Sequence, residues 1–187
     1  WLSEEPARLQ DVGAFVRLHG KFMNPGVGHP KERLGDMFEV EGVTSVTFGK
    51  ERGINKLKDC DIGFVVSRVH PSAIACEEIA RGIWPHEDLD LTGEYIRMPM
   101  GYNMRDGRSV GIMGWAHKDQ RVNAVLKLKR EAGLEQMLDR FRLIHNSQPK
   151  LVYVFTNQPF NVVVDELVKL DDAIGPARLM RLVEEYY

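Results

Sequence analysis

Two arginines near the end of the longest periodic segment of the chain are the clearest candidates for chemistry. Arg140 and Arg142 follow Gln136 in this segment. A guanidinium group suits phosphate because it is planar, always charged and able to bind bidentately, and one arginine supplied across a domain cleft stabilises charge on a transferring γ-phosphoryl group. On a helix, Gln136 and Arg140 share a face, whereas Arg142 projects about 200° away from Arg140. Both arginines therefore reach one small anion only if the helix ends or bends there, and a solvated charged helix face is the alternative.

A second candidate is the basic turn that follows a predicted strand over residues 43–48. A glycine beside a basic residue at the end of a parallel strand lets the backbone approach a phosphate or a ribose closely, as in Gly49-Lys50. Asn55 can then hydrogen-bond a hydroxyl group. From Lys50 to Lys58 the chain holds four basic side chains against one acidic side chain. The alternative is a glycine-containing surface turn with ordinary lysines.

A phosphate-binding loop of the Walker A type is absent from the sequence. Both Gly-Lys pairs lack the glycine that the motif needs five positions earlier, where Phe15 and Thr44 stand. The segment Gly26 to Lys31 begins like a dinucleotide-binding fingerprint, but its third glycine is missing and no predicted strand precedes it. The chain alone is therefore not expected to bind and hydrolyse a nucleotide in the usual way.

Two acidic segments have the residue types of metal sites. Asp165 and Glu166 end an apolar run, as in the magnesium-holding strand of many nucleoside triphosphatases. Because the chain has no phosphate loop, we favour solvated carboxylates here. A small-molecule hydrolase that uses both acids with a metal is a further hypothesis. His86, Asp88 and Asp90 lie in a polar loop, where acidic residues are usually solvated. No metal site is predicted.

The composition sets limits on the class of protein. The chain has 187 residues, of which 43% are hydrophobic and 28% charged, and its formal net charge is -2, which indicates a folded domain and argues against a uniformly basic nucleic-acid binder. No apolar run approaches the 18 residues of a membrane span. Cys60 and Cys76 give no disulfide framework and are predicted to be buried thiols. A soluble cytoplasmic protein without membrane contact is expected, and the start at Trp1 suggests a piece of a longer polypeptide.

Hydrophobic periodicity and turn residues predict the elements of the first half. We expect an amphipathic helix from about Pro6 to Phe22, a loop from Asn24 to Pro30 and a short helix over 31–38. Strands are predicted over 43–48 and, as a buried apolar run, over 61–67. Ser72 is the predicted N-cap of a helix that extends to about Gly82.

In the second half, Asp106-Gly107 between two strand-like runs, 94–100 and 109–116, predicts a hairpin. A helical stripe is expected over 122–145, with a break or kink at Gly133 that makes two helices. A strand is predicted over 150–155, a strand running into a short helix over 162–170, and a helix over 176–187. Alternating strands and helices indicate an α/β fold with a largely parallel sheet, flanking helices and an inserted antiparallel hairpin.

These segments resemble superfamily 2 helicases. Thr47 to Pro71, with Arg52-Gly53-Ile54-Asn55 at its core, looks like motif V, and Gln136 to Arg142 is similar to motif VI, in the order found in the second RecA-like domain of such enzymes. The segment from Arg140 to Asn157 also resembles the carboxy-terminal helicase-like region of replication proteins of phages, plasmids and other mobile elements. The resemblance covers about residues 43–165.

The resemblance implies a RecA-like carboxy-terminal motor domain over 43–170, with a hairpin insertion at about 94–116, after a helical segment over 1–42 and before a helix over 171–187. It implies ATP and Mg²⁺ only together with an upstream RecA-like domain of the same polypeptide, which would carry Walker A. The catalytic residues would be Arg140, Arg142 and Gln136, and the nucleotide-binding residues Arg52, Gly53 and Asn55. Backbone phosphates of DNA or RNA would be bound by Thr47, Lys50, Lys56 and Lys58.

Three departures from the motifs support an alternative. Asn55 replaces the usual acid, Asp139 replaces the glycine before the first arginine, and Arg142 comes one residue early. A non-catalytic α/β module of a mobile-element replication protein, which binds nucleic acid or protein, is the second hypothesis.

Overall fold

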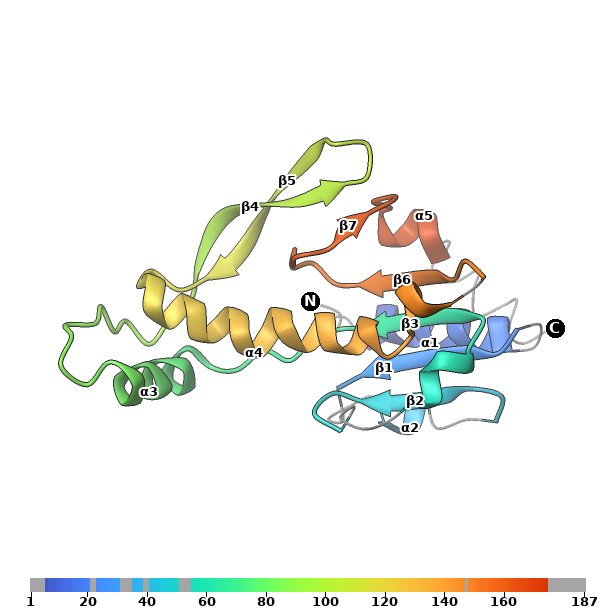
Figure 1. Ribbon diagram of the computed structural model, residues 1–187, viewed down its shortest axis with the longest axis horizontal. Coiled ribbons are helices and arrows are strands. Elements are labelled where there is room, and N and C mark those ends of the chain that lie inside the picture. Colours follow the sequence, from blue (N-terminus) through green and yellow to red (C-terminus); the bar gives the residue numbers. More distant parts are fainter. Residues whose placement is uncertain are drawn as a thin grey trace. The chain divides into compact units, whose positions relative to one another are not determined.

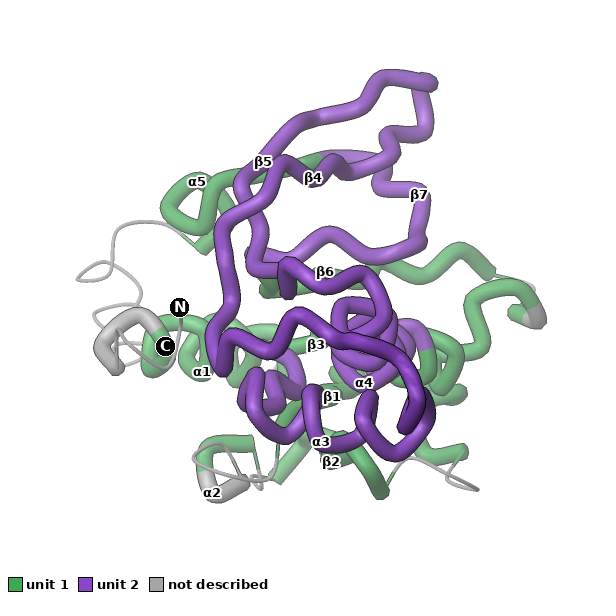
Figure 2. Tube along the Cα trace, turned by 90° about the vertical axis from the view of Figure 1, so that its left-hand side faces the viewer, with its two compact units in different colours: residues 1–67, 136–156, 167–187 green, residues 68–135, 157–166 purple. Residues whose placement is uncertain are grey.

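The computed structural model describes residues 6–20, 23–30, 35–38, 41–50, 55–146 and 148–174. The chain forms two compact units, coloured separately in Figure 2. Unit 1 comprises Trp1–Ser67, Gln136–Thr156 and Leu167–Tyr187, and unit 2 comprises Arg68–Glu135 and Asn157–Glu166. Unit 2 is thus inserted into the sequence of unit 1, and the insertion is larger than the hairpin alone.

A four-stranded parallel sheet forms the centre of unit 1, with the order β2-β1-β3-β6 (Figure 1). Its strands are β1 (Pro25–His29), β2 (Thr44–Thr47), β3 (Ile62–Val66) and β6 (Leu151–Phe155). The predicted α/β fold with a largely parallel sheet is confirmed, and so are the strands expected over 43–48, 61–67 and 150–155. The loop expected over 24–30 is wrong, because these residues form the buried strand β1 between β2 and β3.

One face of this sheet packs on apolar side chains of α1 (Pro6–Gly20), the helix predicted from Pro6. Phe64 alternates with Gly63 and Val65 along β3, so the two faces carry different side chains. The cluster on the Phe64 side is completed by α2 (Gly35–Phe38) and α5 (Leu170–Ile174). Its fully or almost fully buried members are Leu9, Val12, Phe15, Val16, Val27, Phe38, Ile62, Phe64, Val66, Phe155 and Ile174.

Glycines make room on the other face of the sheet. A β-carbon built on Gly28 would lie 2.3 Å from Met137 Cγ, and one built on Gly63 would lie 2.8 Å from the Phe141 ring. Gly26 has the same relation to Phe141. Gly26 and Gly28, which began like a dinucleotide fingerprint, therefore allow close packing of Met137 and Phe141 on the sheet.

Unit 2 combines α3 (Ala73–Ile83) with a hairpin of β4 (Ile96–Met104) and β5 (Ser109–Ala116), and β7 (Val163–Val164) pairs with β4 in parallel. The predicted cap is confirmed, since Ser72 Oγ accepts a hydrogen bond of 3.2 Å from Ala75 N–H. The predicted hairpin is also confirmed, and Gly107 at its turn has a φ of 84°. A small apolar cluster contains Cys76, Ala80, Val122, Val125 and Leu126.

The longest helix, α4 (Gln120–Asp139), contributes residues to both units. The break predicted at Gly133 is wrong, because α4 continues through this residue and ends at Asp139. Leu126 and Leu134, on either side of the glycine, are both fully buried. The described residues also form two short 3-10 helices, η1 (Lys56–Asp59) and η2 (Leu143–His145).

Three other expectations concern single segments. Of the strand and short helix expected over 162–170, the strand corresponds to β7, whereas α5 begins only at Leu170, where that range ends. Cys60 and Cys76 are buried free thiols, as predicted. The helix predicted over 176–187 lies outside the described residues, and among the described helices none has the length and apolarity to cross a membrane.

Candidate functional site

The two motif-like segments meet in unit 1. Arg142 donates a hydrogen bond of 3.3 Å from its guanidinium group to Asn55 Oδ1. The partners are separated by 87 residues in sequence. Asn55 immediately precedes η1, and Arg142 lies in the turn between α4 and η2. The fold thus brings together two residues that the sequence analysis assigned to one site.

Helix α4 ends immediately before Arg140. The amide groups of residues 140, 141 and 142 bond to carbonyls three positions back, at 3.2, 3.0 and 3.0 Å, so the helix tightens and stops. Arg142 has a left-handed backbone, with a φ of 54° and a ψ of 43°, and the fully buried Phe141 anchors the turn to the sheet. Because α4 ends at Asp139, the angle of about 200° that a helix would set between Arg140 and Arg142 does not apply.

An open pocket of about 350 Å³ lies beside Arg142 and is lined by Lys58, Asp59, Arg142 and Asn146. Two of these side chains are cationic and one is anionic. Lys58 and Asp59 approach to 3.8 Å, but both are well exposed, so their ion pair is weak. The Lys150 ammonium group donates to the carbonyls of Lys58 and Phe141 and ties η1 to the end of α4. This arrangement suits a small anion such as a phosphate group.

Arg140 lies two residues before Arg142 and is half-buried. Its Nε is buried and has no hydrogen-bond partner within the described part of the chain. A buried guanidinium nitrogen without an acceptor is costly, and an anionic ligand would supply the acceptor. Gln136, one helical turn earlier, is also half-buried.

Of the predicted site residues, Arg142 and Lys58 line this pocket, whereas Arg140 and Gln136 are not among its lining residues. Thr47 pairs with His29 at the carboxyl end of β2, and Lys50 lies in the turn that follows. Asn55 and Lys58 lie near the amino end of β3, and because β2 and β3 run parallel these are opposite ends of the sheet. Lys56 is exposed in η1, whereas Arg52 and Gly53 lie outside the described residues.

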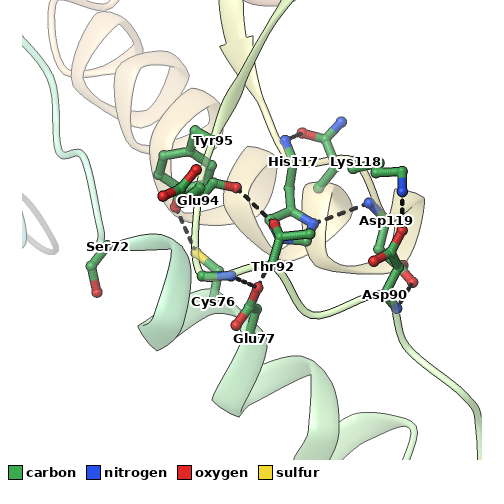
Figure 3. A network of polar contacts seen from close by, with 12 residues as sticks. Ser72, Cys76, Glu77, Asp90, Thr92, Glu94, Tyr95, His117, Lys118 and Asp119 are labelled. Atoms are coloured by element: carbon green, nitrogen blue, oxygen red, sulfur yellow. Dashed lines mark hydrogen bonds and ion pairs between the residues drawn. The ribbon is translucent and has the colours of Figure 1, made fainter.

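A second polar constellation, which the sequence analysis missed, lies in unit 2 (Figure 3). His117 is completely buried and its Nε2 lies 2.9 Å from a carboxylate oxygen of Glu77. The same oxygen accepts a hydrogen bond of 2.7 Å from Gly93 N–H. His117 Nδ1 accepts from Asp119 N–H at 3.1 Å, so Nε2 carries the ring proton. The network joins α3, the loop before β4 and the start of α4.

Electrostatic partners keep the carboxylates of this network charged. Arg121 holds the pKa of Asp119 well below its usual value. Burial alone would raise the pKa of Glu77, but hydrogen bonds from Gly93 and His117 bring it below the usual value. Since His117 is inaccessible, the network is suited to holding unit 2 together rather than to meeting a substrate.

The acidic segments considered as metal sites are engaged in other contacts or exposed. Lys118 forms an ion pair of 2.6 Å with Asp90, and the Asp88 carbonyl accepts from Arg121. Asp165 pairs with Arg105, which lowers the pKa of Asp165, and Glu166 is exposed. Across the described ranges, no group of three or more His, Cys, Asp or Glu residues could hold a metal ion.

Comparison with known proteins adds no relative. No protein-family model matches the chain, and neither the curated proteins nor the solved structures give a match.

Proposed function

We propose that unit 1 is the second, RecA-like domain of a nucleic-acid-dependent NTPase of the helicase type. The hydrogen bond between Asn55 and Arg142 carries this proposal, because it joins the segment that resembles motif V to the one that resembles motif VI. The pocket beside it has two cations and one acid, which fits a phosphate-bearing ligand. An upstream domain with Walker A, in the cytoplasm, would hold ATP and Mg²⁺.

In this proposal the residues divide the work. Arg140, whose Nε has no acceptor among the described residues, stabilises the charge that develops on the γ-phosphoryl group. Arg142 and Gln136 orient the nucleotide beside it, together with Asn55, Arg52 and Gly53. Lys58 lines the same pocket as Arg142, so its partner is a phosphate there. Thr47 and Lys50, at the other end of the sheet, together with Lys56, remain candidates for the backbone of DNA or RNA.

The test is nucleic-acid-stimulated ATP hydrolysis by the polypeptide that joins this chain to its upstream region. Arg140→Ala is expected to lower turnover by about 10³-fold or more, with nucleic-acid binding retained. Arg140→Lys keeps the charge but loses the planar fork, so it is expected to restore turnover only in part. Wild-type turnover in Arg140→Ala would overturn the assignment of Arg140.

Two glycine substitutions form a matched pair for Arg142. Arg142 and Ser67 both have positive φ values, of 54° and 66°, and glycine relieves the strain of that conformation by about 1 kcal/mol. Arg142→Gly and Ser67→Gly are therefore both expected to preserve or raise the melting temperature. Only Arg142→Gly should lower turnover. If Ser67→Gly lowers turnover by the same factor, the loss comes from the change of backbone and not from the Arg142 side chain.

The second candidate function is a non-catalytic module that binds nucleic acid or protein. It is favoured by two departures from the motifs: Asn55 stands where motif V has an acid, and Asp139 stands where motif VI has a glycine. The same assay separates the two functions, since this module would bind nucleic acid or protein while the joined polypeptide shows no stimulated turnover.

A further inference from the structure

The hairpin of unit 2 has one face that is exposed along its whole length. Its antiparallel register places four cross-strand pairs on this face: Arg97 with Trp115, Pro99 with Met113, Gly101 with Gly111, and Asn103 with Ser109. All eight residues are exposed. The opposite face differs, because it buries Tyr102 and Met104 and its Met100 contacts Gln158. The exposed face is named the platform below.

Trp115 and Arg97 form the chemical centre of the platform. The Arg97 guanidinium carbon lies 4.9 Å from the centroid of the Trp115 ring, which is a cation–π contact. Trp115 is 36% exposed and Met113 is 48% exposed. Large aromatic side chains are seldom left open on a sheet unless a partner covers them.

The charge of the platform is complementary to a polyanion. Arg97 is its single charged residue, and the platform contains no carboxylate. From Ile96 to Ala116 the chain holds three arginines and one aspartate, whereas the whole chain has a net charge of -2. Arg105 pairs with Asp165, and Arg108 pairs with Asp106, so the cation that the hairpin offers to a polyanion on the platform is Arg97.

The size of the platform favours a nucleic acid over a protein partner. Four pairs on two strands cover about 20 Å by 10 Å, or about 200 Å², far less than the ~800 Å² that a stable protein interface buries on each partner. The paired glycines also leave one aromatic anchor where a protein interface uses several. A single strand needs less area, because unpaired bases stack on an aromatic ring while an arginine meets the backbone.

We propose that the platform binds single-stranded nucleic acid, with a base stacked beside Trp115 and with Arg97 contacting the adjacent phosphate. Gly101 and Gly111 let the strand lie close to the sheet, and Asn103 and Ser109 offer hydrogen bonds to bases or sugars. This site lies in unit 2 and uses none of the residues proposed for the nucleotide, so it stands even if the NTPase proposal fails.

The experiment measures the anisotropy of a fluorescent 20-nucleotide oligothymidylate titrated with the 187-residue chain. Trp115→Ala is expected to weaken binding about tenfold, and Trp115→Phe to retain most of the affinity. Arg97→Gln should weaken binding and reduce the salt dependence by about 0.7 in the logarithmic slope. Leu128→Ala, at a residue of unit 2 that is 67% exposed on α4, is the matched control and should bind as the wild type does.

An abasic oligomer of the same length separates stacking from charge. The wild type is expected to prefer oligothymidylate, and Trp115→Ala should lose that preference. Equal binding of the two oligomers by the wild type, or unchanged binding by Trp115→Ala, would overturn the proposal. So would a wild-type dimer in sedimentation that Trp115→Ala dissociates, because the platform would then bind a second copy. Circular dichroism of Trp115→Ala, and retained binding by Trp115→Phe, show that a loss of binding does not come from unfolding of the hairpin.

Discussion

In unit 1, the sheet face that packs against Met137 and Phe141 carries three glycines, whereas the interior of unit 2 is organised around the buried pair of Glu77 and His117. In unit 1, the removal of side chains lets Met137 and Phe141 pack directly on the backbone. In unit 2, a small apolar cluster is supplemented by polar groups that satisfy one another.

The two units differ in the kind of amino-acid substitution that destabilises them. Close packing against glycine fails by overlap when an atom is added, and a buried polar network fails by desolvation when one partner is removed. Each unit should therefore be sensitive to the kind of substitution that the other tolerates, and this contrast can be tested.

The largest effect is expected from His117→Ala in unit 2. The substitution leaves the Glu77 carboxylate without its imidazole donor and Asp119 N–H without its acceptor, at a cost of about 3 kcal/mol of unfolding free energy. Chemical denaturation with hydrogen exchange resolved by unit is the measurement, and protection should fall first in α3 and the start of α4. A loss of less than about 1 kcal/mol would mean that the network contributes little to unit 2.

Gly63→Ala is the corresponding substitution in unit 1. The new methyl group would stand 2.8 Å from the Phe141 ring and 3.0 Å from Val152, neither of which moves easily, so a loss of about 2 kcal/mol is expected. Gly28→Ala meets the flexible Met137 side chain instead and should cost less. The pair Gly63→Ala with Phe141→Leu should recover part of the loss in denaturation; no recovery would locate the strain elsewhere.

Acid should weaken unit 2 by a smaller amount. Partial desolvation of the ring, together with the charges of Arg68 and Arg130, lowers the pKa of His70 to about 4 from its usual 6.5. The unfolded chain therefore takes up the proton first, and this share of the stability is present above about pH 6.5 and is lost as the pH falls toward 4. Because His70 is exposed, the share is about 1 kcal/mol at most.

The depressed pKa of Glu77 adds a further loss at lower pH, below its usual 4.5. His70→Asn should remove the first part of the decline and leave the second part in place. Unfolding free energies measured between pH 7 and pH 3 test both parts, and an unchanged decline in His70→Asn would exclude His70 as its source.

The sequence predicted local features well and tertiary ones poorly. Asp106-Gly107 identified the hairpin because its turn needs the positive φ that Gly107 adopts. The sequence does not predict strand β1 because Gly26 and Gly28 interrupt its apolar pattern. These glycines are needed because Phe141 and Met137 pack directly on them.

The same distinction holds for the candidate site. The meeting of Asn55 and Arg142 followed only from the resemblance, because nothing local links residues 87 positions apart. Glu77 and His117 had no such resemblance to connect them across 40 positions, so their network was not foreseen. Asp119 before α4 was the one local signal there, as a residue type that commonly caps helices.

Gly133→Ala should have the smallest effect and the opposite sign. Glycine was expected to break the helix at this residue, yet α4 is continuous there and a β-carbon on Gly133 would meet nothing within 4 Å. Alanine lowers the entropy cost of helix formation without a clash, so the unfolding free energy should rise by about 0.5–1 kcal/mol. Gly63→Ala adds the same methyl group but is expected to lower the unfolding free energy. Comparison of the two variants by thermal or chemical denaturation separates the effect of packing from the effect of backbone entropy. Destabilisation by Gly133→Ala would mean that helix α4 needs flexibility at this residue, and the contrast between a tolerant helix and an intolerant sheet would then fail.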